Sequence, residues 1–204
     1  MIDTLTAMMT SRDAATAEHA CRVQRYATVL AEEVCGEDDR LIEAVTAAAL
    51  LHDIGKLAIP DRLLYKPGPL TCEEYEQVKQ HAVIGAEILE GIVGSGPLSL
   101  IVRHHHENWD GSGYPDGLSA TDIPLGARVL SITDCYDALT SERPYRHRLT
   151  HDSAMAMILE RRGTMYDPAV TDAFIRIVHR LCGPHAVSPD VLPHPFRLRT
   201  PRVI

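Results

Sequence analysis

The sequence lacks the features that characterise nucleic-acid-binding and membrane proteins. Its 204 residues carry a formal net charge of -8, whereas neutralising the phosphates of a nucleic acid requires a surplus of lysine and arginine. No apolar run reaches the length of about 20 residues that spans a bilayer. The N-terminus also lacks the basic and apolar regions of a signal peptide. We therefore expect no nucleic acid and no membrane among its partners.

Aromatic residues and paired cysteines are also scarce. One tryptophan, two phenylalanines and seven tyrosines are present, so the core must consist of alanine, aliphatic residues and methionine, a composition that favours helices. The five cysteines are an odd number and include no C-x-x-C pair. This pattern argues against a disulfide framework or a zinc ribbon, and it favours a reducing compartment, the cytoplasm.

Hydrophobic residues recur at helical spacing along most of the chain. Between residues 23 and 34 they follow the i, i+3, i+4, i+7 pattern of one helical face. Thr71 and Glu74 have the spacing of a capping box, and the glycines and prolines of residues 107–123 indicate a loop. No segment has a convincing strand pattern. Helices are predicted over residues 23–36, 41–52, 71–89, 97–105, 124–138, 150–162 and 167–181.

We therefore predict an all-α fold, a single-domain helical bundle that occupies residues 1–183. Residues 184–204 are rich in proline and have a basic bias, so we expect a loosely ordered C-terminal tail. An apolar first helix around Leu5 and Met8 could pair two copies of the chain, which makes a homodimer a further expectation.

Histidine is unusually frequent, and four of the eleven histidines stand out by position. His19, His52, His81 and His105 each lie on, or one residue from, the apolar face of a separate predicted helix. Burying an imidazole without a partner costs roughly 1–3 kcal/mol, so we expect these side chains to converge on a ligand. Asp134 adds a carboxylate from a fifth helix. Histidine and carboxylate ligands between helices suit iron, manganese or zinc.

Three longer motifs link these positions to a known family. They are HDIGK at residues 52–56, HHENWDGSGYP at residues 105–115 and DCYDALTSERPYR at residues 134–146. Through these motifs, residues 10–180 resemble the HD-GYP domains of the metal-dependent HD phosphohydrolases. The resemblance implies a helical bundle of the HD type with a metal site in its core.

The resemblance also implies a centre of two divalent metals, with iron as the first expectation, manganese as the second, and zinc as a further fit. Some family members bind a third metal through a glutamate four residues before the first histidine, but this chain has Ala15 there. Asp53 would bridge the two metals, and His104 would lie outside the ligand set. The implied ligands are His19, His52, Asp53 and Asp134 for the first metal, and Asp53, His81, His105 and His106 for the second.

Substrate contacts are implied in two places. Lys56, Arg143 and Arg146 resemble phosphate contacts, although a solvated basic loop would also explain the two arginines. The Gly-Tyr-Pro segment would form a lip beside the substrate pocket and a contact surface for diguanylate cyclases, although a rigid turn explains it equally well. The residues of that segment are Gly113, Tyr114 and Pro115.

The activity implied by the resemblance is hydrolysis of cyclic di-GMP to linear pGpG, with a second cut to GMP left open. A hydroxide bridging the metals would attack the phosphorus, and Asp53 and Lys56 would be the catalytic residues. Two alternatives stay open. One is a module that binds the dinucleotide, or docks cyclases through the Gly-Tyr-Pro loop, without turnover. The other is an HD hydrolase for another cyclic dinucleotide or a nucleotide phosphate.

Overall fold

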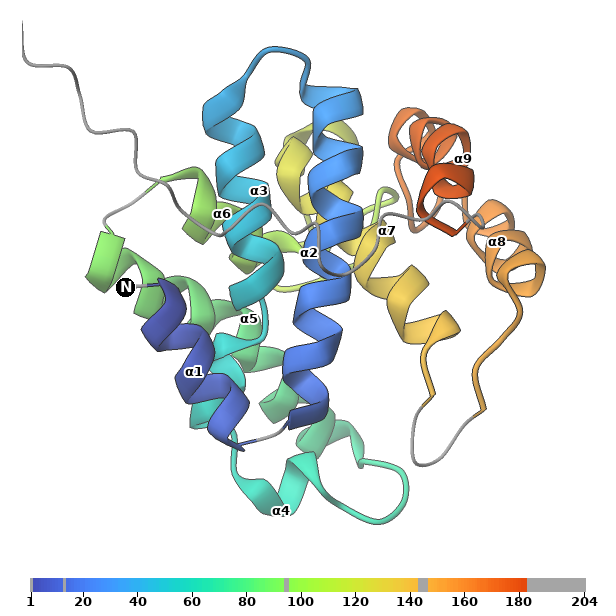
Figure 1. The fold of residues 1–204 in the computed structure, drawn as a ribbon. Coiled ribbons are helices and arrows are strands. Elements are labelled where there is room, and N and C mark those ends of the chain that lie inside the picture. The colour runs from blue at the N-terminus through green and yellow to red at the C-terminus, as the bar shows by residue number, and fades with distance from the viewer. Residues whose placement is uncertain (1, 13, 94–95, 143–146, 183–204) are drawn as a thin grey trace, which may run out of the picture.

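The computed structural model describes residues 2–12, 14–93, 96–142 and 147–182, and in these ranges it contains helices and one isolated β-bridge (Figure 1). The all-α prediction is therefore confirmed. The elements are α1 (Ile2–Arg12), α2 (Ala14–Cys35), α3 (Asp39–Leu51), η1 (Ile54–Ala58), α4 (Asp61–Leu64), α5 (Cys72–Val93), α6 (Pro97–His104), η2 (Ala120–Asp122), α7 (Leu125–Thr140), α8 (His151–Glu160) and α9 (Pro168–Cys182).

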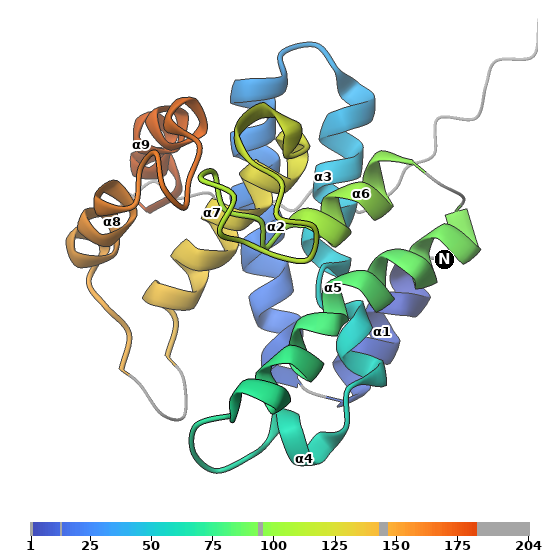
Figure 2. The same cartoon turned by 180° about the vertical axis from the view of Figure 1, so that it is seen from behind.

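Helices α2, α3 and α7 pack against one another at the centre of the fold. Helices α5 and α6 cover one side of this centre, and α8 and α9 lie on the other side, beyond α7 (Figures 1 and 2). Leu30, Leu51 and Leu130, one from each central helix, are fully buried. The core is thus mainly aliphatic, as the scarcity of aromatic residues predicts.

Local sequence signals explain where several helices begin and end. Glu74 Oε2 accepts the Thr71 amide at 2.8 Å, and the Thr71 hydroxyl accepts the Glu74 amide at 3.3 Å, which confirms the predicted capping box at the start of α5. Asp38 caps α3 by accepting the Leu41 amide at 3.1 Å. Gly36 follows α2 with a φ of 61°, the left-handed conformation that glycine favours after a helix.

The chain between α3 and α5 forms two short helices, η1 and α4, that the periodicity of the sequence does not predict. Element η1 packs directly on α5, and the contact depends on Gly55. A Cβ atom at Gly55 would collide with the carbonyl oxygen of His81 and lie 2.6 Å from the amide nitrogen of Gly85. This close approach brings Asp53, at the start of η1, to the side of His81.

Some expectations fall outside the described residues. They concern the tail, since residues 183–204 are not described, and the two arginines Arg143 and Arg146. The domain boundary at residue 183 therefore stays a prediction. Among the helices of the described ranges, none has the length and apolar character needed to cross a membrane.

Candidate metal centre

Histidine and aspartate side chains from five helical segments meet between α2, α3, α5, α6 and α7. They form two groups, in each of which the potential ligand atoms lie within 4.8 Å of one another. The first group is His19, His52 and Asp134, and the second group is His81, His105 and His106. The rings of His52 and His105 are 5.4 Å apart, centroid to centroid, so the two groups adjoin.

The helix backbone orients three of these imidazoles in the same way. In His52, His81 and His105, Nδ1 lies 3.0, 2.8 and 2.7 Å from the carbonyl oxygen three residues earlier. Because a carbonyl only accepts, Nδ1 carries a proton, so Nε2 is the atom of each ring that can offer a lone pair to a metal. The buried Nε2 of His105 has no hydrogen-bond partner in the described part of the chain. A buried unpaired acceptor costs about 1–3 kcal/mol, and a metal ion would satisfy it.

The second group is neutral at physiological pH. Burial lowers the pKa of His105 well below its ordinary value and also lowers the pKa of His81. Burial and the neighbouring His81 lower the pKa of His106 to about 4. Neutral imidazole is the form that binds a metal. Together with two carboxylates, this donor set fits a divalent transition metal.

Asp53 lies between the two groups. Its Oδ2 is 3.6 Å from His52 Nε2, and its Oδ1 is 3.8 Å from His81 Nε2. The Lys56 ammonium donates to Oδ2 at 2.7 Å. Burial raises the pKa of Asp53, but the positive charge and the hydrogen bond of Lys56, together with the electrostatic influence of the nearby imidazoles, outweigh burial and hold the pKa well below its usual range. One ionised carboxylate thus presents an oxygen to each group, the placement that a bridging ligand needs.

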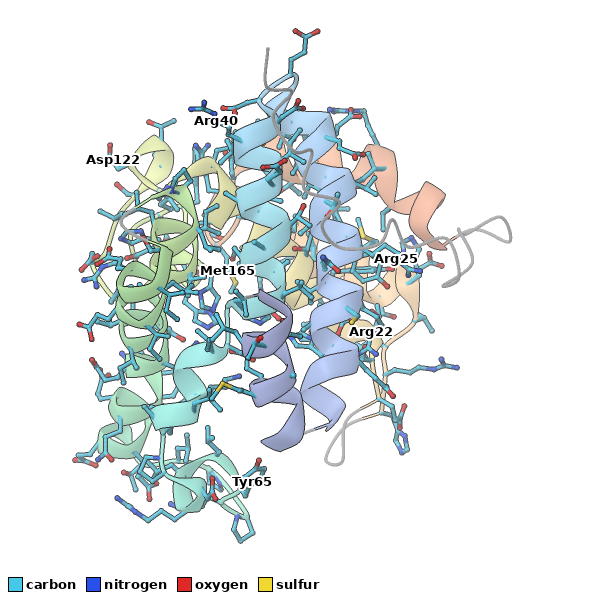
Figure 3. All side chains as sticks on the ribbon, turned by 60° about the vertical axis from the view of Figure 1, so that its left-hand side comes forward. Arg22, Arg25, Arg40, Tyr65, Asp122 and Met165 are labelled. Atoms are coloured by element: carbon cyan, nitrogen blue, oxygen red, sulfur yellow. The ribbon has the colours of Figure 1, made fainter. Side chains whose placement is uncertain are left out.

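A further carboxylate, Asp137, holds His19 from behind. His19 Nδ1 donates to Asp137 at 2.7 Å, while its Nε2 lies 3.2 Å from Asp134. Asp137 is buried and accepts two further bonds, at 2.6 and 3.1 Å, from Arg22, which Figure 3 labels on α2. Burial lowers the pKa of His19, but its bonds to Asp134 and Asp137 raise it to about 9. The only sequence signal for this arrangement is spacing, because Asp137 follows Asp134, and Arg22 follows His19, by three residues.

Asp137→Asn is expected to weaken metal binding by about 10–100-fold, the usual cost of losing the partner that orients a ligating histidine. The amide lacks the charge that holds His19 Nδ1–H and pairs with Arg22. Titration of Mn(II) against a competing chelator measures the affinity. Asp172→Asn is the matched control, because it removes a surface carboxylate that accepts from Arg162 at 2.8 and 2.7 Å. Equal Mn(II) affinity in Asp137→Asn and the unchanged protein would contradict the orienting role.

The loop after α6 closes over the second group. The Tyr114 ring stacks on His106, with centroids 4.9 Å apart and an interplanar angle of 30°. Burial, the nearby Tyr75 hydroxyl and the carboxylates of the centre raise the pKa of Tyr114, so the phenol is neutral. A Cβ atom at Gly113 would collide with the backbone of Glu107. This packing of the loop on itself places Tyr114 at the edge of the centre.

Glu107 and His104 form hydrogen bonds with the loop after α6 and do not belong to the first or the second group of potential ligands. Glu107 Oε1 accepts the amides of Asp116 and Gly117 at 2.8 and 3.0 Å. His104 Nε2 is 2.9 Å from Asp116, which also accepts two bonds from Arg103. The Nδ1 of His104 is 2.9 Å from the carbonyl oxygen four residues earlier, so both of its ring nitrogens have partners. His104 therefore lies apart from the first and second groups.

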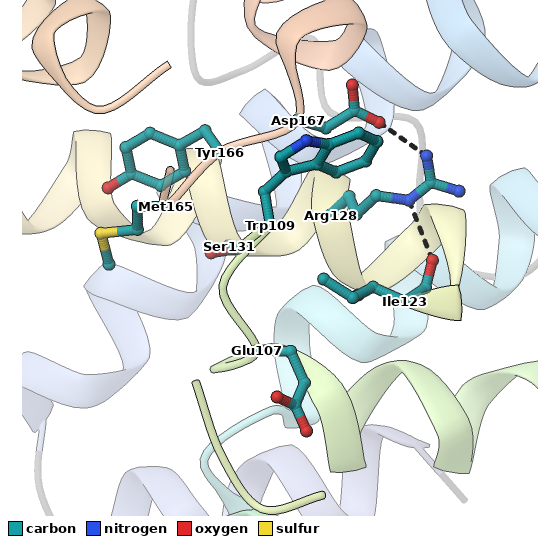
Figure 4. A pocket seen from close by; sticks show the side chains of 8 residues that line it. All are labelled: Glu107, Trp109, Ile123, Arg128, Ser131, Met165, Tyr166 and Asp167. Carbon is teal, nitrogen blue, oxygen red and sulfur yellow. Dashed lines mark hydrogen bonds and ion pairs between the residues drawn. The ribbon is translucent and has the colours of Figure 1, made fainter. Parts of the chain in front are cut away.

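Figure 4 shows the support beneath the start of the loop. Arg128 donates to Asp167 at 2.6 Å, and its guanidinium carbon lies 5.8 Å from the centroid of the Trp109 ring. The Trp109 amide donates to the Met165 carbonyl at 3.1 Å. The loop is thus attached to the segment before α9, far away in the sequence.

The expected substrate contacts have two outcomes. Lys56 contacts Asp53, and Tyr114 contacts His106 of the second group. Gly113 and Pro115 flank Tyr114 in the loop. The other two, Arg143 and Arg146, lie outside the described residues.

The sequence of residues 3–170 matches the family model of the HD domain. The chain belongs to the HD domain family. The expected membership of the HD phosphohydrolases is thereby confirmed. A solved structure of a cyclic GMP-AMP specific phosphodiesterase from V. cholerae has a TM-score of 0.63 and 16% identity, and the match covers 80% of this chain and 44% of that chain. This likeness confirms the predicted HD-type fold.

Curated relatives of this HD domain are closer in sequence. A Vibrio cholerae protein named a probable cyclic di-GMP phosphodiesterase is 41% identical over 186 aligned residues, with 84% of this chain and 42% of that protein covered. Another Vibrio cholerae protein, named 3'3'-cGAMP-specific phosphodiesterase 3, is 39% identical over 154 residues, with 75% and 33% covered. The chain spans less than half the length of the curated relatives it matches.

Proposed function

We propose that this HD domain is a metal-dependent phosphodiesterase that hydrolyses cyclic di-GMP to linear pGpG. The observation that carries the proposal is the position of Asp53, whose two oxygens face two adjoining groups of imidazoles. Such a pair of groups suits two metals that share one carboxylate. The 41% identity to a relative named a probable cyclic di-GMP phosphodiesterase supports the choice of substrate.

The two groups, joined by Asp53, would hold the two metals. When bound, such metals supply Lewis acidity that activates water and neutralises charge on the phosphate. Iron is our first expectation, followed by manganese and then zinc, since all three accept imidazole and carboxylate. The proposed ligands are His19, His52, Asp53 and Asp134 at one position, and Asp53, His81, His105 and His106 at the other.

Side chains of this domain would assist the reaction by supplying charge and by excluding water from the centre. Asp53 is ionised at neutral pH, so it needs no deprotonation before it binds a metal. The Lys56 side chain is 41% exposed beside Asp53, from where its ammonium can donate to a non-bridging phosphate oxygen. Tyr114 covers His106 with its ring and keeps bulk water away from that side of the centre.

Turnover of cyclic di-GMP by protein loaded anaerobically with Fe(II) or Mn(II) tests the proposal. The expected product, separated by chromatography, is pGpG, with or without GMP. We expect Asp53→Ala and His52→Ala each to lower kcat/KM by at least about a hundredfold, because each removes a ligand directly rather than through a partner. Unchanged activity in either variant contradicts the proposed centre.

A second candidate substrate is 3'3'-cGAMP, because a relative with 39% identity is named as specific for it. Comparison of kcat/KM for the two cyclic dinucleotides decides between them. The same assay separates an enzyme from a sensor, since a sensor would bind the dinucleotide tightly and release no product.

We propose a cytoplasmic protein whose Gly-Tyr-Pro loop contacts diguanylate cyclases, and a homodimer through α1. The exposure of Met8, at 54%, supports the use of α1 as a contact. Sedimentation velocity of the unchanged protein and of Met8→Glu tests the dimer.

A further inference from the structure

A row of two aromatic rings and one ammonium group leads from the second group to the surface of α5. The Tyr114 ring stacks on His106 at the inner end. The Lys79 ammonium lies 5.3 Å from the centroid of the Tyr114 ring and 5.3 Å from that of Tyr75. Tyr75, at the outer end, is 49% exposed. We name these three residues, Tyr75, Lys79 and Tyr114, the aromatic wall.

The wall combines two chain segments that are far apart in the sequence. Tyr75 and Lys79 are four residues apart on one face of α5, and such a pair alone is common on a helix surface. Tyr114 comes from the loop after α6, and the centroid of its ring lies 5.3 Å from the same ammonium. The Tyr114 ring also stacks on His106, which belongs to the second group. The wall therefore starts directly beside the metal centre.

The chemistry of the wall matches the part of a cyclic dinucleotide that lies beyond the scissile bond. Such a substrate has two phosphates and two purines, and a metal centre occupies only one phosphate. Exposed aromatic rings stack on bases, and a lysine between them attracts an anion. The Lys79 side chain is 21% exposed and pairs with Glu76 at 2.6 Å. Because Glu76 is itself 64% exposed, this surface pair is weak and a phosphate can displace it.

We propose that Lys79 and Tyr75 bind the substrate of this HD domain, Lys79 through its second phosphate and Tyr75 by stacking on a purine. The inference rests on the proposed function, because it takes a cyclic dinucleotide as the substrate. Neither residue belongs to the metal ligands, so both act on substrate affinity and leave the metals in place.

Kinetics of the metal-loaded protein with cyclic di-GMP test the proposal. Tyr75→Ala is expected to raise KM about tenfold, the order of effect found when a base-stacking ring is lost. Lys79→Met is expected to raise KM by a similar factor of about ten, because it removes a charge-assisted hydrogen bond to the phosphate. We expect kcat to stay within about twofold and metal content to stay unchanged, whereas a damaged centre would lower both. Lys79→Arg, which keeps the charge, should restore most of the affinity.

The matched control is Lys66→Met. Lys66 also pairs with a glutamate of α5, Glu74, at 2.5 Å, so its loss removes the same charge from a neighbouring part of the surface. We expect its KM to change less than about twofold. An equal rise of KM in Lys66→Met and Lys79→Met would overturn the proposal, because the rise would then result from the change in net charge and not from a contact made by Lys79. An unchanged KM in both Lys79→Met and Tyr75→Ala would also overturn it.

A binding measurement separates this inference from the proposed function. The probe is a phosphorothioate analogue of cyclic di-GMP, titrated calorimetrically into the metal-loaded protein. If the unchanged protein binds the analogue but does not hydrolyse cyclic di-GMP, the proposed function fails. The wall is then still supported by a weaker Kd in Lys79→Met, and it is overturned by an equal Kd. Lack of binding by the unchanged protein overturns both.

Discussion

Replacing His105 with alanine is expected to remove one metal equivalent per chain and to lower the turnover of cyclic di-GMP by at least about a hundredfold. The imidazole is 1% exposed, and its buried Nε2 has no hydrogen-bond partner among the described residues. Its ring centroid lies 3.9 Å from that of His106 and 5.4 Å from that of His52, so it touches both groups. Since loss of an orienting partner alone costs about 10–100-fold, loss of a ligand costs at least as much. Elemental analysis and kcat/KM measure the two effects.

The neighbouring histidine provides a matched control. His104 is also buried, at 7% exposed, but both of its ring nitrogens are occupied by the loop and the α6 backbone. His104→Ala is therefore expected to keep two metals and most of the turnover, and to lower the melting temperature through the loss of its bond to Asp116. If His104→Ala loses a metal while His105→Ala keeps two, the assignment of the two histidines is wrong.

Gly55→Ala is expected to lower the melting temperature and metal content together. The added methyl would overlap the His81 carbonyl oxygen, which is part of the α5 backbone and cannot rotate away. Overpacking of this kind typically costs about 1–3 kcal/mol, and each kcal/mol shifts the melting temperature of a chain of this size by about 2–4 °C. Because η1 must move away from α5, the distance between Asp53 and His81 would also increase, which would weaken metal binding. Calorimetry and elemental analysis measure the two effects.

Gly91→Ala is the control for that substitution. Gly91 lies in α5, and a Cβ atom there would meet nothing within 4 Å. Alanine at such a position is expected to stabilise the helix by about 0.5–1 kcal/mol without changing the metal content. A melting temperature that rises in both variants would contradict the close contact between η1 and α5.

The helices of this protein follow from local patterns in the sequence. Apolar spacing, Gly36, Asp38 and the pair of Thr71 and Glu74 act within one or two turns of the chain, and the observed caps confirm this. The same spacing does not predict η1. That segment is too short for a hydrophobic period, and its course is determined by contact with α5.

That the centre consists of imidazole and carboxylate ligands also follows from the sequence. A histidine on the apolar face of a helix becomes buried when the helix packs, and it then needs a partner, whichever helix it packs against. Which side chains belong to the centre depends on packing. Among three consecutive histidines, His104 pairs with Asp116 while His105 and His106 join His81.

Packing likewise brings Asp137 behind His19, and Lys79 between Tyr75 and Tyr114. These contacts join residues up to 118 positions apart. A periodic pattern reports the direction of a side chain on its own helix. The identity of its neighbour depends on how the helices cross. That crossing is determined by contacts of the folded chain, such as those at the glycines and the buried carboxylates.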